Sequence, residues 1–359
     1  MSQSAIKDRP TPAPVPPQGG LSGRSLPRLA PLGFAILSVA LGVGVSIAAG
    51  WESRVQWGLI SALLFVVISY IATSIVENRR QAKDRLATSI VWVCFILAVI
   101  PLLSLAWVTI SKGVKVLDGY FLSHSMSGVL DADPGGGIYH ALLGTIEQVL
   151  IATVIAAPIG LLTAIYLVEY GRGRLAKAVT FFVDVMTGIP SIVAALFILA
   201  TWNLMLGFGP SGFAGAMALA ILMMPVVVRS TEEMLKLVPN ELREASLALG
   251  IPKWRTILKV VLPTAIGGIT TGVMLAVARI AGETAPVLLL VFGTKLINNN
   301  PFEGAQSSLP LYVYEQYAVG TDAAVDRAWA AALVLIAFVM ILNLVARGIA
   351  RWKAPKTGR

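Results

Sequence analysis

The chain has 359 residues, of which 56% are hydrophobic and only 13% are charged, and its mean hydropathy is +0.78. Soluble domains carry about 25% charged residues, so this composition excludes a soluble enzyme, a disordered protein and a coiled coil, and it predicts an integral membrane protein. The net charge of +9 fits either a nucleic-acid partner or the basic cytoplasmic loops of a membrane protein.

Residues 1–29 are rich in proline and contain no long apolar run. This composition predicts a disordered cytoplasmic tail. It does not fit a secretory signal peptide, because the first apolar run begins late, is long and lacks a small-residue cleavage site. Residues 349–359 are predicted to form a short basic cytoplasmic tail.

Eight segments are apolar over the roughly 20 residues that a membrane-spanning helix needs. The fourth, fifth and seventh are long enough to be tilted or broken, and they contain Pro158, Pro190 and Pro286, each of which removes a helix hydrogen bond. We therefore predict an all-α membrane protein, a polytopic bundle of about eight transmembrane helices. The segments are 30–50, 57–76, 88–110, 141–167, 178–206, 213–232, 264–292 and 326–346.

The lysines and arginines lie unevenly on the two sides of these predicted spans. With the N-terminus placed in the cytoplasm, 22 of the 28 lie on the cytoplasmic side, five lie on the outer side, and Arg279 alone lies in the middle of a span. This asymmetry is a strong positive-inside signal. It predicts that the N and C termini are both cytoplasmic, and it makes membrane lipid rather than nucleic acid the expected partner of the positive charge.

The chain has one cysteine, Cys94, and two histidines, His124 and His140. These are too few for an intrachain disulfide or a Cys/His metal site, so no metal is expected. The chain also contains no Gly-Lys dipeptide and therefore no phosphate-binding Walker loop. The sequence runs typical of serine hydrolases and zinc proteases are missing too, which argues against an intramembrane enzyme.

The predicted cytoplasmic loop 233–263 is long enough to fold by itself. Pro239 and Asn240 can start a short surface helix, and Gly250 followed by Pro252 ends it. A second short helix from Lys253 leads into the next span. This pattern alone also fits an ordinary amphipathic loop that lies on the lipid headgroups.

The same loop contains Glu244-Ala245-Ser246, then Gly250 after three residues, and ends on Val260, one residue and Leu262-Pro263. This spacing closely resembles the EAA loop of ABC importer permeases, in which Ile is usual at the position of Val260 and a second Ala at that of Ser246. In that family the loop is the coupling helix, which sits in a cleft of the cytoplasmic ATPase. The resemblance implies a coupling role for Arg243, Glu244, Ala245, Ser246, Gly250, Leu262 and Pro263.

Over roughly residues 88–348 the chain resembles the PstA type of phosphate permease subunit. The resemblance rests on the segments 282–286 (Gly-Glu-Thr-Ala-Pro), 187–193 and 308–310; PstC-type subunits typically have Met-Ala after Gly-Glu-Thr. It implies a permease domain with a six-helix core over 88–348. The two helices of 30–87 are an addition whose role it leaves open.

The resemblance also implies an assembly in the cytoplasmic membrane of a prokaryote. Its other members would be a PstC-like permease, two PstB-like ATPases and an extracytoplasmic phosphate-binding protein. Together with the missing Walker loop, this implies that the chain is a non-catalytic transport subunit without cofactors, and that ATP and Mg²⁺ are bound by the partner ATPases.

Arg279 and Glu283 are charged residues inside the seventh predicted span, where charges are costly and usually functional. They are four residues apart, so they share one face of a continuous helix, and Arg279 lies roughly 15 residues, or about 22 Å, into it. They form either an ion pair that permits insertion or part of an anion path. The arginine fork matches phosphate oxygens. Glu283 can accept a hydrogen bond from the proton that phosphate, unlike sulfate, retains near neutral pH.

Arg229 and Glu232 lie three residues apart at the cytoplasmic end of the sixth predicted span. They fit positive-inside anchoring or a second station for the anion, and the resemblance links an arginine at this place to transport. The favoured cargo is inorganic phosphate. The alternatives are sulfate, molybdate or phosphonate, handled by the same machinery.

Overall fold

The computed structural model describes residues 26–27 and 29–353, so most of the predicted tails 1–29 and 349–359 lies outside the described residues. Within the described part every regular element is a helix, apart from an isolated bridge between Phe292 and Gln306. Seven helices there are long and apolar enough to cross a membrane, and a bent pair brings the number to eight. This confirms the predicted all-α polytopic bundle.

The chain forms two compact units, 1–105 and 106–359. The first contains α1 (Ala30–Ala48), α2 (Arg54–Val76) and most of α3 (Arg79–Gly113). The helices α1 and α2 form a hairpin along small residues, with Ser38, Gly42 and Ser46 buried at every fourth position of α1. A Cβ on Gly42 would overlap Ser61 of α2, so the close approach of the two backbones requires a glycine there.

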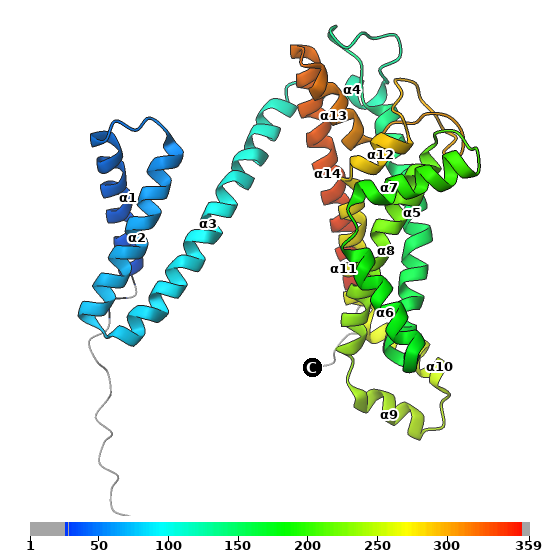
Figure 1. Ribbon diagram of the computed structural model, residues 1–359, viewed down its shortest axis with the longest axis horizontal. Coiled ribbons are helices and arrows are strands. Elements are labelled where there is room, and N and C mark those ends of the chain that lie inside the picture. Colours follow the sequence, from blue (N-terminus) through cyan, green and yellow to red (C-terminus); the bar gives the residue numbers. More distant parts are fainter. Residues whose placement is uncertain (1–25, 28, 354–359) are drawn as a thin grey trace, which may run out of the picture. The chain divides into compact units, whose positions relative to one another are not determined.

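Four long helices run side by side in the second unit, and short helices gather at both ends of this bundle (Figure 1). The most buried of the four is α8, which therefore forms the centre of the unit. The long helices are α5 (Tyr139–Ile165), α8 (Gly212–Lys236), α11 (Leu262–Ala281) and α14 (Asp322–Lys353). At one end lie α4 (Gly119–Ser123), α12 (Ala285–Leu290) and α13 (Leu309–Val319), and at the other α9 (Asn240–Ala248) and α10 (Lys253–Thr256).

The fifth predicted span, 178–206, is broken, as its proline predicted. It consists of α6 (Gly173–Thr187) and of α7 (Ser191–Ile198) with its π-helical continuation η2 (Leu199–Met205), and the two parts meet at an angle of 107°. The bend lies at the segment 188–190, where Pro190 precedes α7. A proline cannot donate a backbone hydrogen bond, and it disfavours helical backbone in the residue before it.

The seventh predicted span, 264–292, is shifted towards the N-terminus. A continuous helix runs from Lys253 through η3 (Ile257–Val261) to Ala281. Gly282 caps its end, and Pro286 lies in the first turn of the separate helix α12, where a proline's missing N–H breaks no helix hydrogen bond. The expectation that Arg279 and Glu283 share one helix face is therefore wrong, because Glu283 lies beyond the helix end.

Two glycines of α11 fix its register against α8. A Cβ on Gly268 would overlap Met234, and a Cβ on Gly272 would overlap Ser230. A residue four positions later in α11 thus faces a residue four positions earlier in α8, so the two helices are antiparallel. Continued along α11, this register places Arg279 level with Met223, near the middle of α8.

Candidate functional site

The loop 233–263, which is predicted to be cytoplasmic, folds into the helix-turn-helix that its sequence predicts. The helix α9 begins directly after Pro239 and ends before Gly250, which has a φ of 75°. Only glycine adopts this left-handed conformation without strain. Nothing lies within 4 Å of the position that a Cβ on Gly250 would take, so this residue leaves an open surface beside the helix.

Arg243 faces inward from α9 rather than toward a partner. Its Nη1 and Nη2 donate to the carbonyl oxygens of Val238 (2.5 Å) and Leu235 (2.9 Å), and its Nε donates to Glu169 Oε1 at 3.0 Å. The Arg243 side chain is only 16% exposed, and that of Glu169 is 6% exposed. Arg243 therefore holds the loop against α8 and against η1 (Tyr166–Tyr170), the continuation of α5.

Ser246 also serves the internal structure of the loop, because its buried Oγ lies 2.9 Å from Thr256 Oγ1 of α10. Of the four predicted coupling residues on α9, the two that are exposed are Glu244 and Ala245. Beyond the helix, Leu249 is 80% exposed.

Leu262 and Pro263 lie at the start of α11, where the proline occupies one of the first two helical positions. Because α11 continues the helix that begins at Lys253, both residues lie inside one continuous helix. They connect the loop to the membrane helix, and Pro263 is exposed whereas Leu262 is half-buried.

Arg279 lies in the last turn of α11, level with the middle of α8. Its Nε is 4.0 Å from Glu283 Oε1, at the limit of an ion pair, and its side chain is 52% exposed. The structure thus brings the predicted pair together although the helix ends between them. The loose contact leaves most of the guanidinium donors of Arg279 open.

Arg229 is held much more tightly. Its Nη1 donates to Glu232 Oε2 at 2.7 Å, its Nη2 pairs with Asp184 of α6, and Glu232 also accepts from Lys236 Nζ at 2.6 Å. A cavity of about 420 Å³ opens beside this group and is lined by Lys177, Asp184 and Glu232 among others. Because two carboxylates already neutralise Arg229, it is less free than Arg279 to take up an anion.

Glu147, a carboxylate near the outer end of α5, already has a partner. Gln306 Nε2 donates to Glu147 Oε2 at 2.5 Å. The next residue of the helix, Gln148, donates to Gln306 Oε1 at 2.9 Å and to the Ser307 carbonyl at 3.2 Å. These contacts fasten the loop before α13 to α5.

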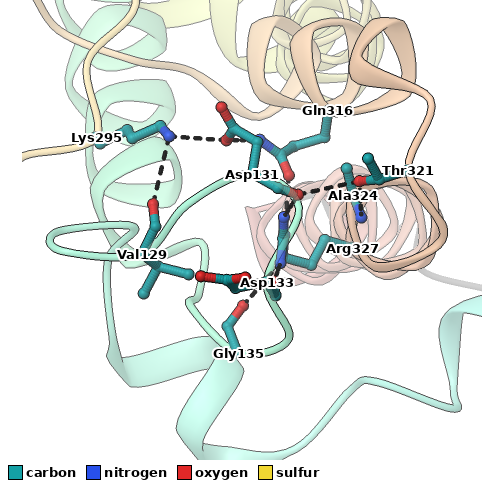
Figure 2. A network of polar contacts seen from close by, with 9 residues as sticks. All are labelled: Val129, Asp131, Asp133, Gly135, Lys295, Gln316, Thr321, Ala324 and Arg327. Atoms are coloured by element: carbon teal, nitrogen blue, oxygen red, sulfur yellow. Dashed lines mark hydrogen bonds and ion pairs between the residues drawn. The ribbon is translucent and has the colours of Figure 1, made fainter.

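Arg327 is the centre of a network at the outer end of the second unit that the sequence did not reveal (Figure 2). This side chain of α14 is only 2% exposed. It donates to the carbonyl oxygens of Asp131 (2.7 Å), Asp133 (2.7 Å) and Gly135 (3.0 Å). Its Nε donates to Gln316 Oε1 at 2.8 Å. A residue predicted only as an outside charge therefore organises the loop between α4 and α5.

Asp131 joins this network to the loop before α13. Its carboxylate lies 2.8 Å from Lys295 Nζ and accepts a hydrogen bond of 3.2 Å from Gln316. The hydrogen bond from Lys295 lowers the pKa of Asp131 below its ordinary value. A cavity of about 350 Å³ opens here, and burial raises the pKa of Glu315, which lines it, with a further contribution from the nearby charge of Asp131.

Replacement of Arg327 by alanine is expected to loosen the outer loops, because it leaves buried acceptors without a donor. The expected loss is about 3 kcal/mol, which corresponds to a fall in Tm of the purified chain of roughly 5 °C. Lys295→Ala is the matched control, since Lys295 and Asp131 form a partly exposed pair and such pairs contribute less than about 1 kcal/mol. Equal Tm values for the two variants would contradict the central place of Arg327.

Residues 156–359 match the family described as "Binding-protein-dependent transport system inner membrane component". The chain is 51% identical over 269 residues to "Phosphate transport system permease protein PstA 1" of Mycobacterium tuberculosis (strain ATCC 25618 / H37Rv), a match that covers 75% of this chain and 87% of that protein. It is 37% identical over 273 residues to "Phosphate transport system permease protein PstA" of Pasteurella multocida (strain Pm70), covering 75% of this chain and 94% of that protein.

Among solved structures, the chain resembles the "bacterial alginate ABC transporter in complex with alginate pentasaccharide-bound periplasmic protein". The TM-score is 0.54 at 16% sequence identity, and the match covers 77% of this chain and 97% of that chain. At this identity the likeness establishes a shared fold and nothing about cargo.

Proposed function

This chain belongs to the binding-protein-dependent transport system inner membrane components, as a permease subunit of the PstA type, and on that premise we propose how it moves inorganic phosphate. It is the permease component of a phosphate ABC transport system and a multi-pass protein of the inner membrane. It is a non-catalytic subunit without cofactors, and the system's ATP is bound by separate ATPases. A periplasmic binding protein belongs to the same system.

The assembly that we infer contains one PstC-like permease, two PstB-like ATPases and an extracytoplasmic phosphate-binding protein. The exposed face of α9, with Glu244 and Ala245, meets an ATPase together with Leu249, the residue that follows the helix. Arg243 and Ser246 stabilise the fold of the loop beneath that surface, because their side chains form hydrogen bonds within the chain. Gly250 keeps its edge free of side-chain atoms.

The path of the anion passes Arg279. This proposal rests on one observation: Arg279 lies level with the middle of α8, and a single loose contact to Glu283 leaves its donors open. A guanidinium presents a planar fork that suits phosphate oxygens. Once the anion has passed, Glu283 can pair with Arg279 again and close the path.

Arg229 is the second station, closer to the cytoplasm. It lies six residues beyond Met223 along α8, or about 9 Å at 1.5 Å per residue. Its two carboxylate partners, Asp184 and Glu232, hold it until the anion arrives. The neighbouring cavity of about 420 Å³ is large enough for an oxyanion.

Glu283→Gln is expected to weaken the discrimination between phosphate and sulfate. A carboxylate accepts a hydrogen bond from the proton of phosphate and repels sulfate, whereas an amide does not repel it. In proteoliposomes that contain the whole complex, sulfate should inhibit ATP-dependent phosphate uptake about tenfold more strongly in the variant than in the wild type.

Glu303→Gln is the matched control, because Glu303 is an exposed carboxylate of the outer loop. An unchanged sulfate inhibition in Glu283→Gln would remove Glu283 from the selection step. Uptake of sulfate instead of phosphate by the wild-type complex would replace the proposed cargo with the alternative oxyanion.

A further inference from the structure

The turn that joins α2 to α3 carries a cluster of cations that the transport function leaves unexplained. A cavity of about 560 Å³ opens at this turn, and Tyr70, Ser74, Arg79, Arg80 and Lys83 line it. All five belong to the first compact unit. The charge asymmetry of the chain places this turn on the cytoplasmic side of the membrane.

The three cations of the cavity have no carboxylate partner among the residues that the structure describes. Within that part of the chain, the ion pairs include Arg85 with Glu77, but none of Arg79, Arg80 or Lys83. Glu77, the nearest acid before α3, is engaged elsewhere: its Oε1 accepts from Leu26 N at 2.8 Å and lies 3.5 Å from Arg85 Nη2. Asp84, an exposed acid early in α3, does not line the cavity, so the lining residues carry a net positive charge.

The turn is fixed in position by Asn78. Its Oδ1 accepts hydrogen bonds from the backbone N–H of Arg80 at 3.1 Å and of Gln81 at 3.0 Å. This contact caps the first turn of α3, a helix of 35 residues. The positive end of the helix dipole thus adds to the charge of the side chains.

A neutral donor completes the cavity. Tyr70 O–H lies one helical turn before Ser74, whose own hydroxyl donates to the Ile71 carbonyl at 2.8 Å. Ser74 is therefore occupied, and Tyr70 is the hydroxyl that remains for a ligand. Two guanidinium groups, an ammonium and a phenol form a donor set that matches the oxygens of a phosphate group.

The surroundings of the cavity favour a lipid over free phosphate. Along α2, side chains at every fourth position form an apolar stripe next to Tyr70 and Ser74. They are all exposed in this chain: Leu63, Val67, Ile71 and Ile75. An amphiphile with a phosphate headgroup would place its head among the cations and its acyl chains along this stripe.

We propose that the α2–α3 turn binds the phosphate headgroup of an anionic phospholipid of the cytoplasmic leaflet. Basic pockets between transmembrane helices on this side of a membrane have the charge and depth that such headgroups need. The site gives the two-helix addition at the N-terminal side of the permease a role in fixing the subunit to a particular lipid.

The test uses the purified complete transporter in detergent, titrated with phosphatidylglycerol, with phosphatidylcholine or with inorganic phosphate. The readouts are the shift in Tm and the amount of each lipid retained in native mass spectra. The double variant Arg79→Gln/Arg80→Gln is compared with Arg172→Gln/Arg174→Gln, which removes the same charge from another exposed cytoplasmic segment.

Phosphatidylglycerol is expected to raise the Tm of the wild type and of the 172/174 control. The 79/80 variant should bind it about thirtyfold more weakly. Equal binding by the two double variants would overturn the site. An equal response to phosphatidylcholine would overturn the selectivity for anionic lipid, and an equal response to inorganic phosphate would assign the same cavity to the free anion instead of a lipid.

Discussion

ATP-driven phosphate uptake is expected to fall at least about tenfold when Arg279 is replaced by alanine in the reconstituted complex. A hydrogen bond to a charged group contributes about 1.5–3 kcal/mol, which corresponds to a factor of roughly 10 to 150. The side chain is half exposed and has only the loose contact to Glu283. Its removal should therefore affect the anion more than the stability of the chain.

Two further variants separate charge from bulk. Arg279→Lys keeps the charge but not the planar fork, and we expect uptake between those of Arg279→Ala and the wild type. Leu275→Ala shortens a side chain one turn earlier on α11, with an exposure of 65%, and it should leave uptake unchanged. Full uptake by Arg279→Ala would exclude Arg279 from the path.

Gly250→Leu is expected to lower the ATP hydrolysis that the binding protein stimulates in the complex by at least about fivefold. The added side chain would point from the open edge of α9 into the surface that we assign to the ATPase. Overpacking of a tight contact costs about 1–3 kcal/mol. Uptake of phosphate should fall in the same proportion, because we propose that this contact couples hydrolysis to transport.

Gly173→Leu is the matched control for this variant. Gly173 also has a positive φ, of 80°, and nothing lies within 4 Å of the position that a Cβ would take there. It lies at the start of α6 rather than beside α9. The two substitutions therefore introduce a similar backbone strain of about 1–2 kcal/mol, and equal losses of hydrolysis would show that strain, not docking, is responsible.

The helices were predictable because their signals are local. Apolar runs located the spans, Pro190 located the bend between α6 and α7, and Pro239 and Gly250 located both ends of α9. Each of these signals acts through the residue's own backbone or its immediate neighbours. The end of α11 at Ala281 was misjudged because hydropathy stays high through residue 292, although Gly282 and Pro286 mark the break.

The polar contacts were not predictable in the same way, because they join distant parts of the chain. Arg327 binds the carbonyl of Asp133, 194 residues away, and Arg229 pairs with Asp184, 45 residues away. Every residue has a backbone carbonyl, so the sequence does not indicate which carbonyls accept hydrogen bonds from a distant side chain. The family resemblance implies a coupling role for Arg243, but the sequence does not show that its donors bind Leu235, Val238 and Glu169 of the same chain.

The double attachment of Arg243 has a mechanical consequence. Its hydrogen bonds to Leu235 and Glu169 connect α9 to the ends of α8 and of α5 at once. A displacement of α9 is therefore expected to move α8 and α5 together, rather than to bend only the loop. Because α8 is the buried centre of the unit and carries Arg229, motion of an ATPase at the proposed α9 surface would displace the helix that carries the proposed inner anion site.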